Sequence, residues 1–192
     1  MSFQRPMATT RSTTGISTCK LGVYWVIGSE IVIFGGLLAA YVMFRLAHGS
    51  WAHESAHTNV VAGGINTLVL LTSSLFVVLA HQAAEKKDTK KAFKYIWFTI
   101  AGAAAFLCIK SVEWSGEIHH GLTIHKSLFW AFYYTAAGIH AFHVICGAII
   151  MAIVANDVKK GKDLQRVEAI GLYWHFVDIV WIFLFPLLYI AK

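Results

Sequence analysis

The sequence predicts an all-α membrane protein, a polytopic transmembrane bundle whose chain crosses the bilayer five times. Three observations support this fold class: 57% of the 192 residues are hydrophobic, only 14% are charged, and the apolar residues gather in five long runs. A soluble domain of this size needs more charge to cover its surface. Lipid is therefore expected to be part of the solvent of this protein.

Each apolar run is long enough for a spanning helix, which needs about 20 residues to cross a hydrocarbon core of roughly 30 Å. Residues 1–19 form a polar tail rich in Ser and Thr, without the apolar segment and cleavage site of a signal peptide. Residues 20–192 are expected to form a single five-helix domain. The expected helices cover about residues 20–46, 61–82, 92–116, 127–155 and 168–190.

The positive charges predict how the bundle is oriented. Of the 16 Lys and Arg residues, 12 fall in the N-terminal tail, the loop after the second run and the loop after the fourth run. Short loops rich in Lys and Arg stay in the cytoplasm, so we expect the N-terminus inside and the C-terminus outside. This placement also explains the net charge of +6 without a nucleic-acid partner.

Ionisable residues inside the apolar runs are the candidate functional residues, because each costs at least about 2.5–3.5 kcal/mol at the bilayer centre. Glu30 lies ten residues into the first run. Two interpretations stay open for it: a carboxyl that exchanges a proton or contacts a lipid headgroup or partner helix, and a protonated carboxyl bonded to a neighbouring helix.

The last two runs carry further polar residues at helical spacing. His140 and His143 share one face of the fourth expected helix, and Glu168, His175 and Asp178 form a polar stripe on the fifth. Histidines and carboxylates together could bind a metal or haem, but such sites need ligands on facing helices with a supporting second layer. Interhelical hydrogen bonds and ion pairs are the favoured interpretation.

Two other patterns are expected to be structural. Lys110 and Glu113 can meet on one helix face, with the lysine reaching toward the membrane interface. The spacing ExxH, typical of di-iron bundles, occurs at Glu54–His57 and at Glu117–His120, but both pairs are expected in solvated outer loops. No nucleophile–base pair, phosphate-binding loop or haem-attachment motif is visible, so no catalytic or metal-ligating residue is assigned.

The last run resembles a known family. Glu168, followed after six residues by His-Phe-Val-Asp-x-Val-Trp at 175–181, closely resembles the final helix of subunit III of haem-copper terminal oxidases. The resemblance covers residues 20–190, and the five helices are similar to the short bacterial form rather than the seven-helix mitochondrial type. Four further elements resemble that family in order: Ser29-Glu30, Ile65-Asn66-Thr67, Lys110-x-x-Glu113-Trp114 and Gly138-x-His140-Ala141-x-His143-Val144. Two residues depart from the family pattern, because glutamine is usual in place of Lys110 and glycine in place of Ala141.

This resemblance implies a non-catalytic subunit of a respiratory oxidase in the bacterial inner membrane. It implies no cofactor in this chain, haem and copper in partner subunits I and II, and cytochrome c or quinol as electron donor. Its implied roles are assembly, retention of phospholipid and sustained proton uptake by the catalytic subunit. The histidine and carboxylate residues would link the fourth and fifth helices. The buried polar set implied for lipid or proton-uptake support is Glu30, Glu113, His140, His143, Glu168, His175 and Asp178.

Three alternatives remain open at this point. One is an accessory five-helix subunit of a nitric oxide reductase. The second is a membrane haem- or quinone-binding electron carrier that uses His140, His143 and His175. The third is a transporter with a proton site at Glu30, against which stands the absence of internal repeats and of paired broken helices.

Overall fold

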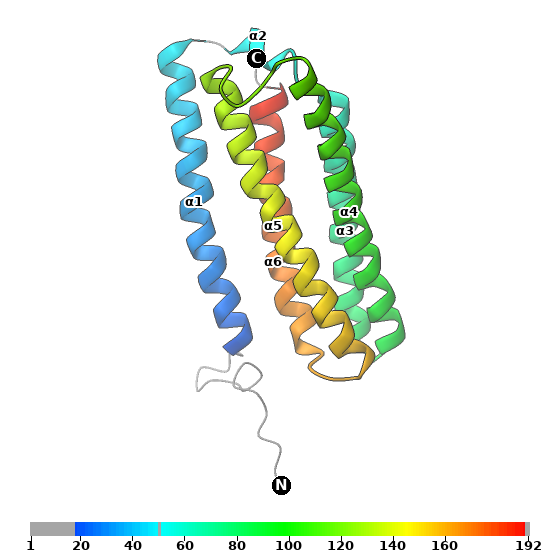
Figure 1. Cartoon of the computed structure of the whole chain (residues 1–192). Coiled ribbons are helices and arrows are strands. Elements are labelled where there is room, and N and C mark those ends of the chain that lie inside the picture. Colours follow the sequence, from blue (N-terminus) through cyan, green and yellow to red (C-terminus); the bar gives the residue numbers. More distant parts are fainter. Residues whose placement is uncertain (1–17, 50, 191–192) are drawn as a thin grey trace.

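The computed structural model describes residues 18–49 and 51–190, which form a bundle of five long helices joined by short loops (Figure 1). All five helices are long and apolar enough to cross a membrane, and the described residues contain no strand. The predicted all-α, five-span fold class is therefore confirmed. Of the predicted polar tail, residues 1–17 lie outside the described part. The long helices are α1 Thr18–His48, α3 Val60–Glu85, α4 Thr89–His119, α5 Leu128–Lys159 and α6 Gln165–Phe185.

Most of the helices extend past the apolar runs that predicted them, because polar capping residues decide where they begin. The Asn59 side chain accepts from the Ala62 amide at 3.0 Å and starts α3. Asp88 starts α4 in the same way, and Ser127 starts α5. A capping side chain satisfies amides of the first turn, which have no partner within the helix. Hydropathy thus predicts the part of a helix that lies in hydrocarbon, not its ends.

Two short elements were not predicted. Helix α2, Ala52–Ser55, lies between α1 and α3, and the chain after α6 widens into a π-helical turn, η2, at Pro186–Ile190. Proline has no N–H to donate to the preceding turn, which accounts for the change of helix type at Pro186. The Tyr41 hydroxyl donates to the Leu187 carbonyl at 2.7 Å, so this turn also ties α1 to the end of the chain.

The loops segregate by charge between the two ends of the bundle. The start of α1, the α3–α4 loop and the α5–α6 loop lie at one end, whereas α2, the α4–α5 loop and the C-terminal end of the chain lie at the other (Figure 1). The two basic loops therefore share an end with the start of α1, as the positive charges require. Which side of the membrane that end faces stays a prediction.

Helix α6 is the centre of the bundle and α1 its periphery. In the most apolar 18-residue stretch of each span, half of the residues are buried in the last span, compared with 11% in α1. Among the described residues of α1, only Phe34 and Tyr41 are buried. Small residues allow the central helices to approach closely. A Cβ added to Gly147 of α5 would lie 2.9 Å from the Trp174 ring of α6. The largest fully buried side chains include Trp130, Trp174, Trp181, Tyr133, Tyr189 and Phe106.

Candidate functional site

The glutamate of α1 and the second histidine of α5 meet in the structure. Glu30 Oε2 lies 3.1 Å from His143 Nε2, and both side chains are about one-seventh exposed. The other ring nitrogen, His143 Nδ1, lies 2.8 Å from the Ile139 carbonyl. A carbonyl only accepts, so Nδ1 carries a proton and donates it to Ile139. Glu30 Oε2 has no aligned hydrogen-bond donor among the described residues, so the two groups form a close ionisable pair without a hydrogen bond between them.

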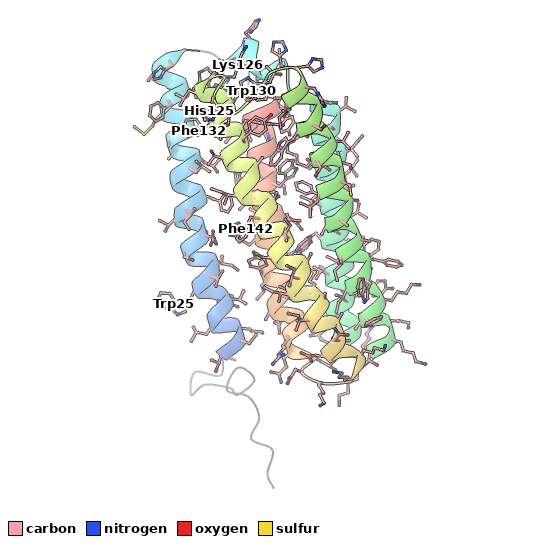
Figure 2. All side chains as sticks on the ribbon, in the orientation of Figure 1. Trp25, His125, Lys126, Trp130, Phe132 and Phe142 are labelled. Atoms are coloured by element: carbon pink, nitrogen blue, oxygen red, sulfur yellow. The ribbon has the colours of Figure 1, made fainter. Side chains whose placement is uncertain are left out.

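This pair lines a cleft of about 490 Å³ between α1, α5 and α6. The lining is mostly apolar, with Glu30 and His143 part-way along the spans and Arg166 at the end that carries the basic loops. Phe142 projects into the space between α5 and α1 (Figure 2) and is more than half exposed. The cleft thus places this ionisable pair beside an apolar surface open to lipid.

The polar stripe of α6 contacts other helices than those expected. Glu168 forms an ion pair with Lys20 of α1, and His175 Nδ1 lies 2.7 Å from the Ser74 hydroxyl of α3. The expectation that the histidine and carboxylate residues link the fourth and fifth spans was wrong in this respect. Since α6 lies at the centre, its polar side chains reach neighbours on several sides. A bond between α5 and α6 does exist, from the Tyr173 hydroxyl to the His143 carbonyl at 3.2 Å.

Five residues of the recognised motifs have a buried polar atom without a hydrogen-bond partner among the described residues: Glu30, Asn66, Trp114, His140 and Asp178. In Asn66 of α3, His140 of α5 and Asp178 of α6, both polar atoms of the side chain lack one. They are at most 3% exposed. The His140 ring packs between Phe106 and Trp181, at centroid distances of 5.4 and 5.1 Å. An unsatisfied buried polar group costs about 1–3 kcal/mol, so these positions carry hydrogen-bonding capacity that packing does not use.

A second polar cluster lies at the end of the bundle that carries α2, and the sequence revealed it only in part. We call it the Lys110 cluster; it consists of Lys110, Glu113 and Glu117 of α4, Tyr133 of α5 and Tyr189 of η2. Lys110 Nζ lies 3.1 Å from Glu113 Oε2 and 2.9 Å from the Tyr133 oxygen, and it also bonds to the Tyr189 hydroxyl. The predicted meeting of Lys110 with Glu113 on one helix face is confirmed.

Two expectations about this cluster were wrong. Lys110 does not reach toward the interface: it is 2% exposed, because a carboxylate and two hydroxyls within the bundle accept its three N–H bonds. Glu117 is not a solvated loop residue either, since α4 continues to His119 and Glu117 is 6% exposed. The Tyr133 hydroxyl donates to Glu117 Oε1 at 2.8 Å. The spacing of positions 110, 113 and 117 on one helix face was the signal that could have found it.

The histidines do not converge on a common point. His140 contacts aromatic rings of α4 and α6, His143 contacts α1, and His175 contacts α3. Within residues 18–49 and 51–190, no group of three or more His, Cys, Asp or Glu side chains is arranged to hold a metal ion. The ExxH pair at Glu54–His57 lies on and just after α2 and joins no such group.

Comparison with known proteins decides the family. The family model described as cytochrome c oxidase subunit III matches residues 6–192, nearly the whole chain. The chain belongs to the cytochrome c oxidase subunit III family. With its five membrane-spanning helices, this subunit III is a multi-pass protein of the bacterial membrane and part of a multi-subunit oxidase complex.

The relatives include chains of similar length and one much longer chain. A cytochrome c oxidase subunit 3 from Thermostichus vulcanus is 33% identical over 88% of this chain and 86% of its own length. One from Corynebacterium diphtheriae is 31% identical over 90% and 88% of the two chains. A haem-copper oxidase subunit I+III from Aeropyrum pernix is 29% identical over 87% of this chain, which corresponds to 22% of that longer protein.

Proposed function

We propose that this subunit III packs against the catalytic haem-copper subunit I and subunit II, retains phospholipid beside them and sustains proton uptake by the catalytic subunit. The observation that carries the proposal is the Glu30–His143 pair, which borders an apolar cleft at the periphery of the bundle. Haem and copper would reside in the partner subunits, and cytochrome c or quinol would donate electrons to the complex. The chain itself would contribute packing, lipid retention and support of proton uptake.

The outward face of α1 supports a partner helix or lipid there. Trp25 points away from the bundle (Figure 2), and Val32, Met43 and Leu46 are, like Trp25, at least 70% exposed. Exposure of this kind suits lipid or another membrane helix. The relative from Aeropyrum pernix, whose name joins subunits I and III in one chain, supports subunit I as that neighbour.

The cleft between α1, α5 and α6 suits acyl chains of a phospholipid. Its apolar lining lies along the spans, whereas Arg166 stands at the end with the basic loops, where lipid phosphates would lie. Lys20 of α1 lies at the same end and pairs with Glu168. Arg166 pairs with Asp157 and Asp163, so a headgroup phosphate would bind one of these cations by replacing a carboxylate partner.

The Glu30–His143 pair supports the protonic part of the proposal. Both of its side chains are groups that can bind and release a proton, and they lie in contact within an apolar cleft. Intramembrane ionisable pairs of this kind mark proton pathways and proton-storage sites in membrane proteins. The pair would thus favour proton delivery near the surface that subunit I shares with α1.

The test is affinity purification of the tagged chain from native membranes in a mild detergent, with a reduced-minus-oxidised visible spectrum and phospholipid analysis. Larger subunits, haem bands, bound phospholipid and oxygen consumption are expected to co-elute with the chain. Co-elution with an enzyme that consumes nitric oxide instead would favour the nitric oxide reductase alternative. A chain that is isolated alone and is coloured would show that its histidines bind haem, and the proposal would be abandoned.

A further inference from the structure

The hydrogen bonds of the Lys110 cluster can be assigned by counting donors and acceptors. The Lys110 ammonium has three N–H bonds and three acceptors within reach: Glu113 Oε2, the Tyr133 oxygen and the Tyr189 oxygen. Since an ammonium only donates, Tyr133 and Tyr189 must direct their own O–H bonds elsewhere. The Tyr189 hydroxyl donates to Glu113 Oε1, at 2.7 Å. Only the direction of the Tyr133 hydroxyl is left undecided.

The Tyr133 hydroxyl has two carboxylate acceptors at nearly equal distance. Its oxygen lies 2.8 Å from Glu117 Oε1 and 2.9 Å from Glu113 Oε1. When Glu117 is ionised, Tyr133 donates to Glu117. When Glu117 carries a proton, the Glu117 O–H can donate to the Tyr133 oxygen, and Tyr133 turns its own O–H to Glu113. Every hydrogen bond is satisfied in both states, and no heavy atom needs to move.

The charges of the cluster favour the uptake of one proton. One ammonium faces two carboxylates, so the buried cluster carries one negative charge in excess until a proton binds. Four aromatic rings stand within 6 Å of the Lys110 ammonium, those of Trp114, Tyr133, Trp181 and Tyr189, and they replace water around it. An uncompensated buried charge is costly, whereas a neutral, fully hydrogen-bonded cluster is not.

The remaining titratable groups near the cluster do not supply a second cation. Tyr134 of α5 lies 3.4 Å from Glu117 Oε2 and donates to the Leu122 carbonyl at 2.7 Å. His140 lies two turns from Tyr133 on α5 and packs against aromatic rings. Among the described residues, no hydrogen bond or ion pair joins the cluster to the other charged or histidine side chains of this end, which are Arg45, His48, His53, Glu54, His57, His119, His120, His125 and Lys126.

We infer that Glu117 is a one-proton binding site, held beside the neutral Lys110–Glu113 pair and switched by the hydroxyl of Tyr133. The ligand is a single proton, and the side of Glu117 that faces the α4–α5 loop is the one bordered by Tyr134 and the Leu122 carbonyl. This site lies on α4, α5 and η2 and is separate from the Glu30–His143 pair, which joins α1 to α5. The inference rests on the geometry of this chain alone and holds whether or not the proposed oxidase roles hold.

The test is infrared spectroscopy of the full-length chain in lipid nanodiscs while the pH is lowered from mildly alkaline to mildly acidic. The carbonyl stretch of a protonated carboxyl group reports proton binding directly. We expect a band that grows on acidification, is absent in Glu117→Gln and shifts in frequency in Tyr133→Phe because its hydrogen-bond partner is lost. Any band from Glu30 or Asp178 should persist unchanged in both variants. Tyr173→Phe, which removes a hydroxyl bonded to the His143 carbonyl, is the matched control and should leave the band unchanged.

Several results would overturn the inference. If every band that grows on acidification persists in Glu117→Gln, the proton binds elsewhere. A band lost in Glu113→Gln but kept in Glu117→Gln would assign the proton to the other carboxyl. An unshifted band in Tyr133→Phe would remove the switch. If Glu117→Gln does not fold, the shift in Tyr133→Phe decides the question by itself.

Discussion

Replacement of Lys110 by methionine is the sharpest test of the packing described above. Methionine has a similar shape but leaves Glu113 without its cation, 3.1 Å away, and leaves the oxygens of Tyr133 and Tyr189 without a donor. Removing one partner of a buried ion pair costs about 3–5 kcal/mol, because the other charge stays buried and unpaired. We therefore expect the free energy of unfolding of Lys110→Met to fall by about that amount.

Two further variants isolate the physical cause. Lys110→Gln keeps two N–H donors for Glu113 and a tyrosine oxygen, so it should lose about 1–3 kcal/mol, the cost of a partly satisfied buried group. The double variant Lys110→Met with Glu113→Gln removes both charges and should recover part of the loss. The summed destabilisations of the single variants Lys110→Met and Glu113→Gln should then exceed that of the double variant by about 0.5–3 kcal/mol, the coupling energy of the pair.

The assay is equilibrium unfolding of the full-length chain in mixed micelles, followed by helical circular dichroism and by tryptophan fluorescence. Trp114 and Trp181, two of the seven tryptophans, have rings centred within 6 Å of the Lys110 ammonium, so part of the emission comes from the cluster. Stability of Lys110→Met equal to that of the wild type would refute the reasoning. Strict additivity of the two single effects in the double variant would refute the ion pair as its cause.

Three further outcomes are expected. Gly147→Ala should lower the free energy of unfolding by about 1–3 kcal/mol, because its Cβ would lie 2.9 Å from the fully buried Trp174 ring; Gly138→Ala, whose Cβ would have 3.9 Å to its nearest neighbour, should cost little in the same unfolding assay. Hydrogen bonds from the first turn of α4 hold the pKa of Asp88 below its usual value. The ionised Asp88 cap therefore stabilises the fold fully at pH values above the usual pKa of Asp, and this stabilisation is lost as the pH falls through the lowered pKa. Asp88→Asn should keep the cap but abolish this pH dependence in thermal unfolding. Glu30→Gln in the intact complex should leave the visible haem spectrum unchanged while oxygen consumption declines faster over repeated turnovers; an altered haem spectrum or undiminished turnover would contradict the proposed role.

Local properties of the sequence were enough to predict the number of membrane spans and the position of the candidate residues along them. A hydrocarbon core demands about 20 apolar residues from each spanning segment, so five runs of that length meant five spans. Capping residues such as Asn59 and Asp88 then extended the helices beyond those runs. Likewise, the charge of the loops predicted that the basic ones share an end. These properties depend on one segment at a time, and each can be read without its neighbours.

The partners of the polar residues were decided by the tertiary structure. Spacing placed Lys110 and Glu113 on one face of a helix, but it could not show that Tyr133 and Tyr189, from two other elements, turn that face into a closed network. Similarly, Glu30 was recognised as an intramembrane carboxyl, whereas its contact with His143 depends on how α1 lies against α5. Which faces meet is set by the rotation of each helix about its axis and by close contacts such as that of Gly147 with Trp174, and these are properties of the packed bundle.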